Sequence, residues 1–285
     1  MSQGGSFGRL SWRGLEPFGV EVSFDFRQPL TLEEQAHFRD LLFGRRLLVM
    51  RGQSLSLEQQ QDVAGYIGPV LRGERGMAYV DPNDGILNDA ALSFHTDLAF
   101  APEPFTALSL HALDVEADQT STVFADAAQA FRTLRPELKA QIEGRRAVFV
   151  QPFRSDARQI DSAGWHAPWE LSREVVLRHP TTGDPVLFVN EQHVDHIEGL
   201  GPSESFALIS ALFEHLYAPA NIFEHRWRNG DFLLWDNIAL QHGRPSIHGV
   251  ERRKLQRASV ARQSLLEQLP DFFEHRPEMA ASAHP

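Results

Sequence analysis

Two short stretches of the chain place a histidine two residues before an aspartate. One holds His95 and Asp97, within SFHTDLAF, and the other holds His193 and Asp195, within VNEQHVDHIEG. Side chains two residues apart on a β-strand point to the same face, so each pair could offer an imidazole nitrogen and a carboxylate oxygen to one metal ion. An ordinary hydrogen-bonded pair has the same spacing, and the motif alone leaves both uses open.

The residues around each pair favour the first pair as a metal site. Phe94 to Phe100 has the apolar pattern of a buried β-strand, whereas the glycines and proline after Asp195 are typical of a loop. A rigid metal site needs ligands that are fixed on regular structure. We therefore predict that His95 and Asp97 are metal ligands.

A third ligand is expected from His242, in GDFLLWDNIALQHGRP, which follows a buried strand predicted at 232–235. Two histidines and one carboxylate on one face of ferrous iron leave the other positions open for substrate and dioxygen. A lone histidine in such a place is often structural. Arg253 and Arg257 favour the functional use, because a guanidinium can bind both oxygens of a carboxylate at once.

Composition limits the function classes. The chain has 285 residues, of which 42% are hydrophobic and 23% charged, and this predicts a globular protein with a large core. The formal net charge is -11 and the basic residues are scattered, so nucleic acid is not an expected partner. The chain has no cysteine, which excludes disulfides, thiolate metal sites and a cysteine nucleophile.

The chain shows no apolar run long enough to span a bilayer and no signal peptide. We therefore expect a cytoplasmic protein with no membrane partner. Neither an internal repeat nor a domain boundary is visible, so a single catalytic domain over residues 1–285 is predicted. Its N-terminus and its C-terminal tail, EHRPEMAASAHP, are expected to be frayed.

Strand patterns dominate the chain between about residues 93 and 262. Short apolar or alternating runs such as FTALSLHAL, STVFAD, PVLFVN and GDFLLWD each predict a strand. These strands do not alternate regularly with helices, so a doubly wound parallel sheet fits poorly. We predict a mainly β fold, a jelly roll or β-sandwich with helices packed outside it.

Four helices are expected, two before these strands and two among them. Thr31 and Glu34 predict a capping box at the start of the first helix, and Ser56 predicts the start of the second. Apolar spacing predicts a third helix over about 126–142 and a fourth that Ser203 caps. The polar and aromatic segment 154–170 is either a lid over a pocket or an ordinary surface loop.

Several motifs together resemble one known family, the taurine dioxygenase and chlorophenoxyacetate dioxygenase (TauD/TfdA) family of iron(II)- and 2-oxoglutarate-dependent oxygenases. The order and spacing agree for FHTDLAF followed by P, STVFAD, LRHPTTGDPVLFVN, RWRNGDFLLWDNIALQH and RRKLQRASVA. The similarity covers about residues 18–262. It implies a double-stranded β-helix, the cupin-like form of the jelly roll, flanked by α-helices.

The resemblance also implies roles for individual residues. By position His95, Asp97 and His242 would be the iron ligands. Arg253 would face the far carboxylate of 2-oxoglutarate, with the hydroxyl of Thr122 beside it. The cofactors would be Fe(II), 2-oxoglutarate and O2, and the reaction would oxidise an aliphatic C–H bond while 2-oxoglutarate becomes succinate and carbon dioxide.

The resemblance favours a small anionic substrate. Arg257 stands where relatives that oxidise sulfonates or aryloxy acids hold the substrate anion, and His193 stands where a substrate-pocket residue is common. Taurine itself is not favoured, because Ala91 replaces the usual asparagine, and the usual tryptophan before the first ligand is Phe94. Aromatic side chains are expected to shield the reaction, the candidates being Phe94, Phe153, Trp165 and Trp169.

Other functions stay open at this point. Within the oxygenase class, the reaction could belong to catabolism, with cleavage of the product, or to biosynthesis, with hydroxylation or desaturation of an amino-acid-derived metabolite. A cupin-like metal-dependent isomerase or binding protein would also use these ligands, although it has no need of Arg253 and Thr122. A homo-oligomer is what the resemblance suggests.

Overall fold

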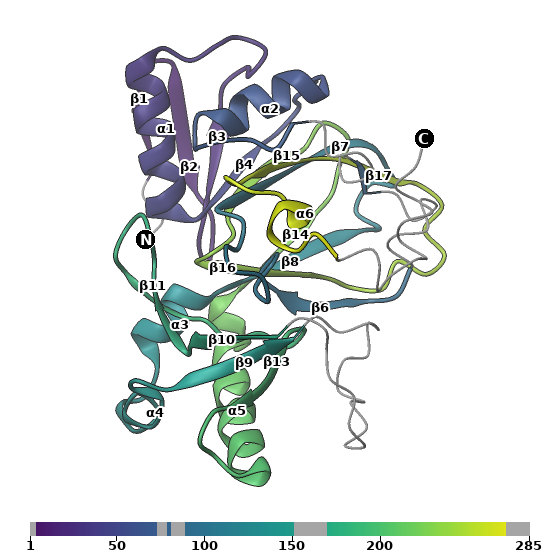
Figure 1. Cartoon of the computed structure of the whole chain (residues 1–285). Helices are drawn as coiled ribbons and strands as arrows, with labels where there is room; N and C mark the ends of the chain where they lie inside the picture. Colours follow the sequence, from purple (N-terminus) through teal and green to yellow (C-terminus); the bar gives the residue numbers. More distant parts are fainter. Residues whose placement is uncertain (1–3, 73–78, 81–88, 151–169, 272–285) are drawn as a thin grey trace.

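The computed structural model describes residues 4–72, 79–80, 89–150 and 170–271. Two antiparallel sheets form the centre of the molecule (Figure 1). The larger has the strand order β1 (Gly5–Phe7), β2 (Leu10–Gly14), β3 (Val20–Ser23), β4 (Leu47–Met50), β15 (Phe232–Asp236), β7 (Ala107–Val115), β17 (Arg253–Val260) and β5 (Tyr79–Val80), with β3 and β4 paired in parallel. The smaller has the order β14 (Ile222–Arg226), β8 (Ser121–Asp126), β16 (Leu240–Arg244) and β6 (Leu92–His95).

The two sheets pack face to face around one hydrophobic core. Side chains alternate between the two faces of a strand, and in β15 Leu233 and Trp235 point inward. The ring of Trp235 meets that of Phe124, from the smaller sheet, at 5.4 Å between centroids. The predicted mainly β, jelly-roll core with flanking helices is therefore confirmed.

The outer face of the larger sheet has its own apolar core. Phe232 and Leu234 of β15 belong to it, together with Phe38 of α1 (Leu32–Arg45). The helix α2 (Leu57–Gly65) packs against β17 and β7 (Figure 1). Both helices begin at the predicted caps, with the expected capping box at Thr31 and a second capping box, formed with Gln59, at Ser56.

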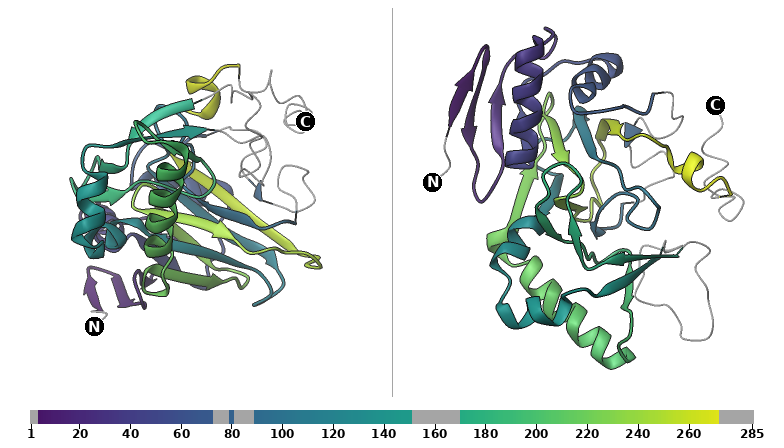
Figure 2. Two further views of the ribbon diagram at one scale, coloured as in Figure 1. Left: turned by 90° about the horizontal axis from the view of Figure 1, so that it is seen from below. Right: turned by 60° about the vertical axis from the view of Figure 1, so that its left-hand side comes forward.

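A second group of elements lies on the other side of the smaller sheet (Figure 2). Its helices are α3 (Ala127–Thr133), α4 (Pro136–Ile142), α5 (Pro202–Leu216) and the 3-10 helix η1 (Pro219–Asn221). Its strands are β10 (Glu170–Glu174), β9 (Arg146–Val150), β13 (Val194–Ile197), β11 (Val176–Arg178) and β12 (Pro185–Leu187). The short helix α6 (Leu265–Gln268) follows β17.

Two helix predictions were wrong in detail, and proline explains both. The helix predicted over 126–142 is split into α3 and α4, because Pro136 cannot continue a helix and leaves Arg135 extended, with ψ 143°. The helix predicted to start after Ser203 begins at Pro202, with Gly201 as its cap. Proline is favoured at the first helical position, where its missing N–H costs nothing.

The structure describes the N-terminal residues from Gly4 onward but not residues 272–285. The N-terminus was predicted to be frayed, but β1 and β2 form a hairpin that Arg9 ties to α1 through Glu34, at 2.6 Å. The C-terminal residues 272–285 lie outside the described residues. None of the helices that the structure describes has both the length and the apolar character needed to cross a bilayer.

Candidate active site

Three polar side chains converge on the inner face of the smaller sheet. His242 of β16 pairs directly across from His95, the last residue of β6, so both rings lie on the same face, 4.2 Å apart. Asp97 Oδ1 lies 3.3 Å from His95 Nε2 and 3.9 Å from His242 Nε2. One ligand atom from each residue lies within 4.8 Å of the others, a separation that suits a shared metal ion.

The backbone around this group differs from the prediction. A continuous strand was expected from Phe94 to Phe100, but β6 ends at His95, and residues 97–100 form a turn. Leu98 in this turn has a positive φ of 60°. Asp97 therefore reaches His95 because the chain turns back on itself, and the alternation of a strand does not place it there.

The protonation of the two rings suits metal binding. The Nδ1 atom of His95 lies 2.9 Å from the carbonyl oxygen of Ser93, which can only accept, so Nδ1 donates there and Nε2 is the nitrogen that faces Asp97. This nitrogen lies 3.3 Å from an oxygen of Asp97, an arrangement that a cation between them would stabilise. Burial, with the nearby His95, lowers the pKa of His242 to about 3 and keeps its ring neutral at neutral pH.

Arg257 pairs directly with Asp97, and its Nη2 atom lies 2.5 Å from Asp97 Oδ2. Burial raises the pKa of the Asp97 carboxyl, but the guanidinium of Arg257, together with His95 and His242, outweighs this and holds that pKa well below its usual value. The carboxylate therefore stays ionised. Two imidazoles and one carboxylate form a nitrogen and oxygen donor set that fits ferrous iron.

Arg253 is the second arginine of β17 that faces the interior. Its side chain is buried, with the residue 3% exposed, and its Nε donates to Thr120 Oγ1 at 2.8 Å. Its Nη1 atom is buried and has no hydrogen-bond partner among the described residues. Burial, followed by the charge of Arg244, lowers the pKa of Arg253 to about 9. A buried cation with an unused N–H group fits a carboxylate ligand.

Thr122, whose hydroxyl was expected beside Arg253, is buried on β8. Its Oγ1 accepts a hydrogen bond from Trp227 Nε1 at 3.0 Å. An indole N–H only donates, so the hydroxyl hydrogen of Thr122 is left to donate to another acceptor. The hydroxyl that contacts Arg253 is that of Thr120, which sequence reasoning missed although it lies two residues before Thr122.

The second histidine and aspartate pair does not converge. His193 is buried, with Nδ1 3.1 Å from Asn190 Oδ1, and its ring lies 6.2 Å from that of His95. Burial, followed by the charge of His95, lowers the pKa of His193 to about 3. The Asp195 side chain is 35% exposed and pairs with His196 Nδ1 at 2.7 Å.

The structure describes only one of the four aromatic side chains that were expected to shield the reaction, Phe94. Phe94 precedes His95 on β6, so its ring points to the outer face of the sheet, where it stacks on Tyr217 at 4.5 Å. The prediction that Phe94 contacts substrate or shields the reaction therefore does not agree with its position. Phe153, Trp165 and Trp169 lie outside the described residues, as does nearly all of the predicted lid.

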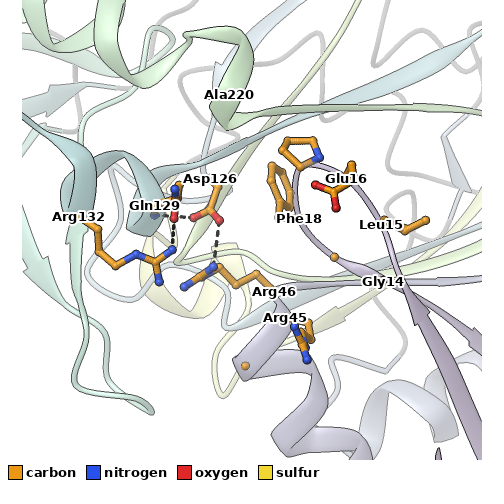
Figure 3. A pocket seen from close by; sticks show the side chains of 13 residues that line it. Gly14, Leu15, Glu16, Phe18, Arg45, Arg46, Asp126, Gln129, Arg132 and Ala220 are labelled. Carbon is orange, nitrogen blue, oxygen red and sulfur yellow. Dashed lines mark hydrogen bonds and ion pairs between the residues drawn. The ribbon is translucent and has the colours of Figure 1, made fainter. Parts of the chain in front are cut away.

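A separate polar pocket lies between the β2–β3 connection, the end of α1 and the start of α3 (Figure 3). Arg46 pairs there with Asp126 at 2.9 Å, and Arg132 donates to Gln129. These side chains satisfy one another, and the pocket shares no residue with the group around Asp97.

The sequence matches a family model described as taurine catabolism dioxygenase TauD, TfdA family, over residues 11–259. An alpha-ketoglutarate-dependent 2,4-dichlorophenoxyacetate dioxygenase from Cupriavidus pinatubonensis is 27% identical in an alignment of 269 positions that covers 85% of this chain and 93% of that protein. A 3-((Z)-2-isocyanoethenyl)-1H-indole synthase from Fischerella ambigua is 27% identical over 277 residues, covering 88% of this chain and 96% of the relative.

Solved structures agree with the fold. A taurine dioxygenase from Burkholderia xenovorans superposes with a TM-score of 0.76 at 25% identity, covering 89% of this chain and 91% of the other. The enzyme AAD-2, solved with Mn(II) and N-oxalylglycine, gives a TM-score of 0.73 at 25% identity, covering 90% of this chain and 98% of the other. Because the family model matches most of the chain, the protein belongs to the TauD/TfdA family and is an iron(II)- and 2-oxoglutarate-dependent dioxygenase.

Proposed function

We propose that this dioxygenase oxidises an aliphatic C–H bond of a small anionic organic molecule at the site around Asp97. The observation that carries the proposal is the convergence of one nitrogen from each of two histidines and one oxygen from Asp97 within 4.8 Å. His95, Asp97 and His242 would hold the iron. Iron and 2-oxoglutarate together supply the activation of dioxygen, with succinate and carbon dioxide as products.

Arg253 and Thr122 would hold the far carboxylate of 2-oxoglutarate. Arg253 contributes a buried Nη1 atom with no partner among the described residues, and Thr122 contributes a hydroxyl hydrogen that its bond with Trp227 leaves free. The buried guanidinium gains a counter-ion when the carboxylate binds. A cupin-like isomerase has no need of this anchor, so the unpaired Arg253 nitrogen favours the oxygenase.

Arg257 would select an anionic substrate. Of its five N–H donors, one donates to Asp97 Oδ2, and the others can donate to a further carboxylate, sulfonate or sulfate oxygen. His193, whose ring lies 6.2 Å from that of His95, would form part of the pocket wall. The relative from Cupriavidus pinatubonensis, named for 2,4-dichlorophenoxyacetate, supports a substrate of this class.

The test is succinate release by the iron-loaded enzyme with a panel of aryloxy acids, sulfonates, sulfate esters and their neutral amide or alcohol analogues. We expect turnover of anionic members only. Arg257→Gln should raise the KM for the preferred anion by about 10- to 100-fold, the value of one charged hydrogen bond. Equal turnover of neutral analogues, with no effect of this substitution, would contradict the role of Arg257.

A second candidate is a biosynthetic oxidation of an amino-acid-derived metabolite, by hydroxylation or desaturation. The observation that favours it is the Fischerella ambigua relative, which is named as a synthase and matches 88% of this chain. Such a substrate would also carry a carboxylate for Arg257. Adding N-acyl amino acids to the same panel distinguishes the two candidates.

The cytoplasmic location and the homo-oligomeric state expected from the sequence also belong to this proposal. The absence of cysteine supports a protein that needs no disulfides, as is usual in the cytoplasm. The formal net charge of -11 supports the expectation that nucleic acid is not a partner.

A further inference from the structure

The side chain of Asn237 holds the backbone of Asp97 from both sides. Asp97 N donates to Asn237 Oδ1 at 3.1 Å, and Asn237 Nδ2 donates to the Asp97 carbonyl oxygen at 3.2 Å. Asn237 is fully buried and follows β15, 140 residues further along the chain. One amide side chain thus satisfies both backbone groups of the proposed ligand.

The orientation of this amide is fixed by a third contact. Asn237 Nδ2 also donates to the carbonyl oxygen of Phe105, at 2.8 Å. Turning the amide over would point its oxygen at two carbonyl oxygens and its NH2 group at an N–H, so only one orientation satisfies all three bonds. The backbone of Asn237 is anchored separately, because its N–H donates to the carbonyl oxygen of Thr106 at 3.1 Å.

The turn that carries Asp97 needs such support. Leu98 has a φ of 60°, a left-handed conformation that is unfavourable for a residue with a side chain. The turn's own hydrogen bonds join Ala99 N to Thr96 O and Ala101 N to Leu98 O. A strained conformation persists only where the surrounding structure holds it, and Asn237 supplies two bonds next to the strained residue.

The backbone and the side chain of Asp97 are therefore held by different residues. Asn237 fixes the peptide groups on either side of the Asp97 Cα atom. Arg257 fixes Asp97 Oδ2, which lies 2.5 Å from its Nη2 atom. With both in place, Oδ1 faces the nitrogens of His95 and His242. Loss of the backbone contacts would let the turn relax away from the two rings.

We propose that Asn237 is a positioning residue that sets the metal affinity of the site by holding Asp97 in place. The inference rests on the proposed metal site, and it adds a residue that touches neither metal nor substrate. Partners of this kind, one step away from the metal, typically change metal affinity by 10- to 100-fold when they are altered.

The test compares ferrous iron dissociation constants of folded variants, measured anaerobically. Asn237→Asp keeps the shape of the side chain but turns two donors into an oxygen that faces two carbonyls, and Asn237→Ala removes the contacts without adding charge. The matched controls are Asn221→Asp and Asn221→Ala, because Asn221 is also buried and donates to a backbone carbonyl, of His215, at 3.0 Å.

We expect both Asn237 variants to bind iron about 10- to 100-fold more weakly than the unaltered protein, and both Asn221 variants to bind it normally. The visible charge-transfer band of the iron and 2-oxoglutarate complex should also change in the Asn237 variants at saturating iron. A purely structural role would lower the melting temperature without changing the band. Wild-type iron affinity in folded Asn237 variants would overturn the inference while leaving the proposed function intact.

Hydrogen exchange of the unaltered apoprotein covers the case in which no Asn237 variant folds. The Asp97 amide should exchange slowly before iron is added, because Asn237 already accepts its hydrogen. Exchange as fast as that of an exposed loop would overturn the inference. If the unaltered protein binds no iron, the proposed function fails, and the role of Asn237 fails with it.

Discussion

The two stretches with a histidine two residues before an aspartate have the same spacing but different structures. In the first, His95 and Asp97 face each other at 3.3 Å beside His242. In the second, His193 is buried while Asp195 points outward and pairs with its neighbour His196. The spacing of the residues therefore does not decide whether a pair can bind metal.

The difference lies in the backbone that follows each histidine. After His95 the chain turns, and long-range contacts hold Asp97 against the inner face of the sheet. After His193 the chain enters β13, whose pairing with β9 is shifted between Val194 and His196, and Asp195 is left at the surface. A metal site at the first stretch thus depends on a turn that distant residues support.

Among the substitutions that test the difference between the two stretches, Asp97→Ala should have the largest effect. Removing the carboxylate leaves two imidazoles, and we expect iron affinity to fall by at least about 100-fold and succinate release to fall below detection. Calorimetry or anaerobic titration measures the first effect, and a succinate assay the second. Retained iron binding would show that Asp97 is not a ligand.

Arg253→Gln tests the binding of 2-oxoglutarate separately from the binding of iron. We expect the dissociation constant for 2-oxoglutarate to rise by about 10- to 100-fold, because a charged hydrogen-bond donor to the far carboxylate is lost. Iron affinity should not change. Arg252→Gln is the matched control, since Arg252 is exposed and pairs with Asp114 at 3.1 Å. Equal effects of the two substitutions would contradict the role of Arg253.

His193→Asn tests the buried histidine of the second stretch through the stability of the apoprotein. The folded pKa is about 3 and the unfolded value is about 6.5, so between these values the unfolded chain binds a proton that the folded chain does not. The contribution of the neutral, buried His193 to the free energy of unfolding is therefore complete above pH 6.5 and is lost as the pH falls toward 3.

Denaturant unfolding between about pH 4.5 and 7.5 measures this effect. The free energy of unfolding should fall less steeply with acid in His193→Asn than in the unaltered protein. Asparagine can keep the bond to Asn190, because its amide group replaces Nδ1 as a donor. An unchanged pH dependence would show that His193 is not buried in the neutral form.

The smallest effect is expected for Asp195→Ala. The pair with His196 is solvent-exposed, and such pairs contribute at most about 1 kcal/mol. Iron affinity and succinate release should stay at the level of the unaltered protein, as an iron titration and a turnover assay would show. Loss of iron in this variant alone would reverse the assignment of the two stretches.

Local patterns predicted much of the fold. The capping box at Thr31, the cap at Ser56 and the density of strands were confirmed, because each depends on neighbouring residues. The helix over 126–142 was wrong, since apolar spacing was followed across Pro136. The strand after His95 was also wrong, because tertiary contacts favour a turn there over the local strand preference.

Local patterns likewise predicted only part of the candidate site. Residue types and spacing pointed to His95, Asp97 and His242, which the structure brings together, but not to the residues that support them. Asn237 contacts Asp97 across 140 residues, and Thr120 contacts Arg253 across 133, so no local pattern reveals either contact. The pairing of Arg257 with Asp97 likewise appears only in three dimensions.

The most direct test of the proposed iron site is an anaerobic titration of the apoprotein with ferrous iron and 2-oxoglutarate, with His95→Ala alongside. A weak visible charge-transfer band in the unaltered protein, absent from the variant, is the result expected. Iron bound without a band would contradict the roles of Arg253 and Thr122. A band that persists in His95→Ala would contradict the metal site itself.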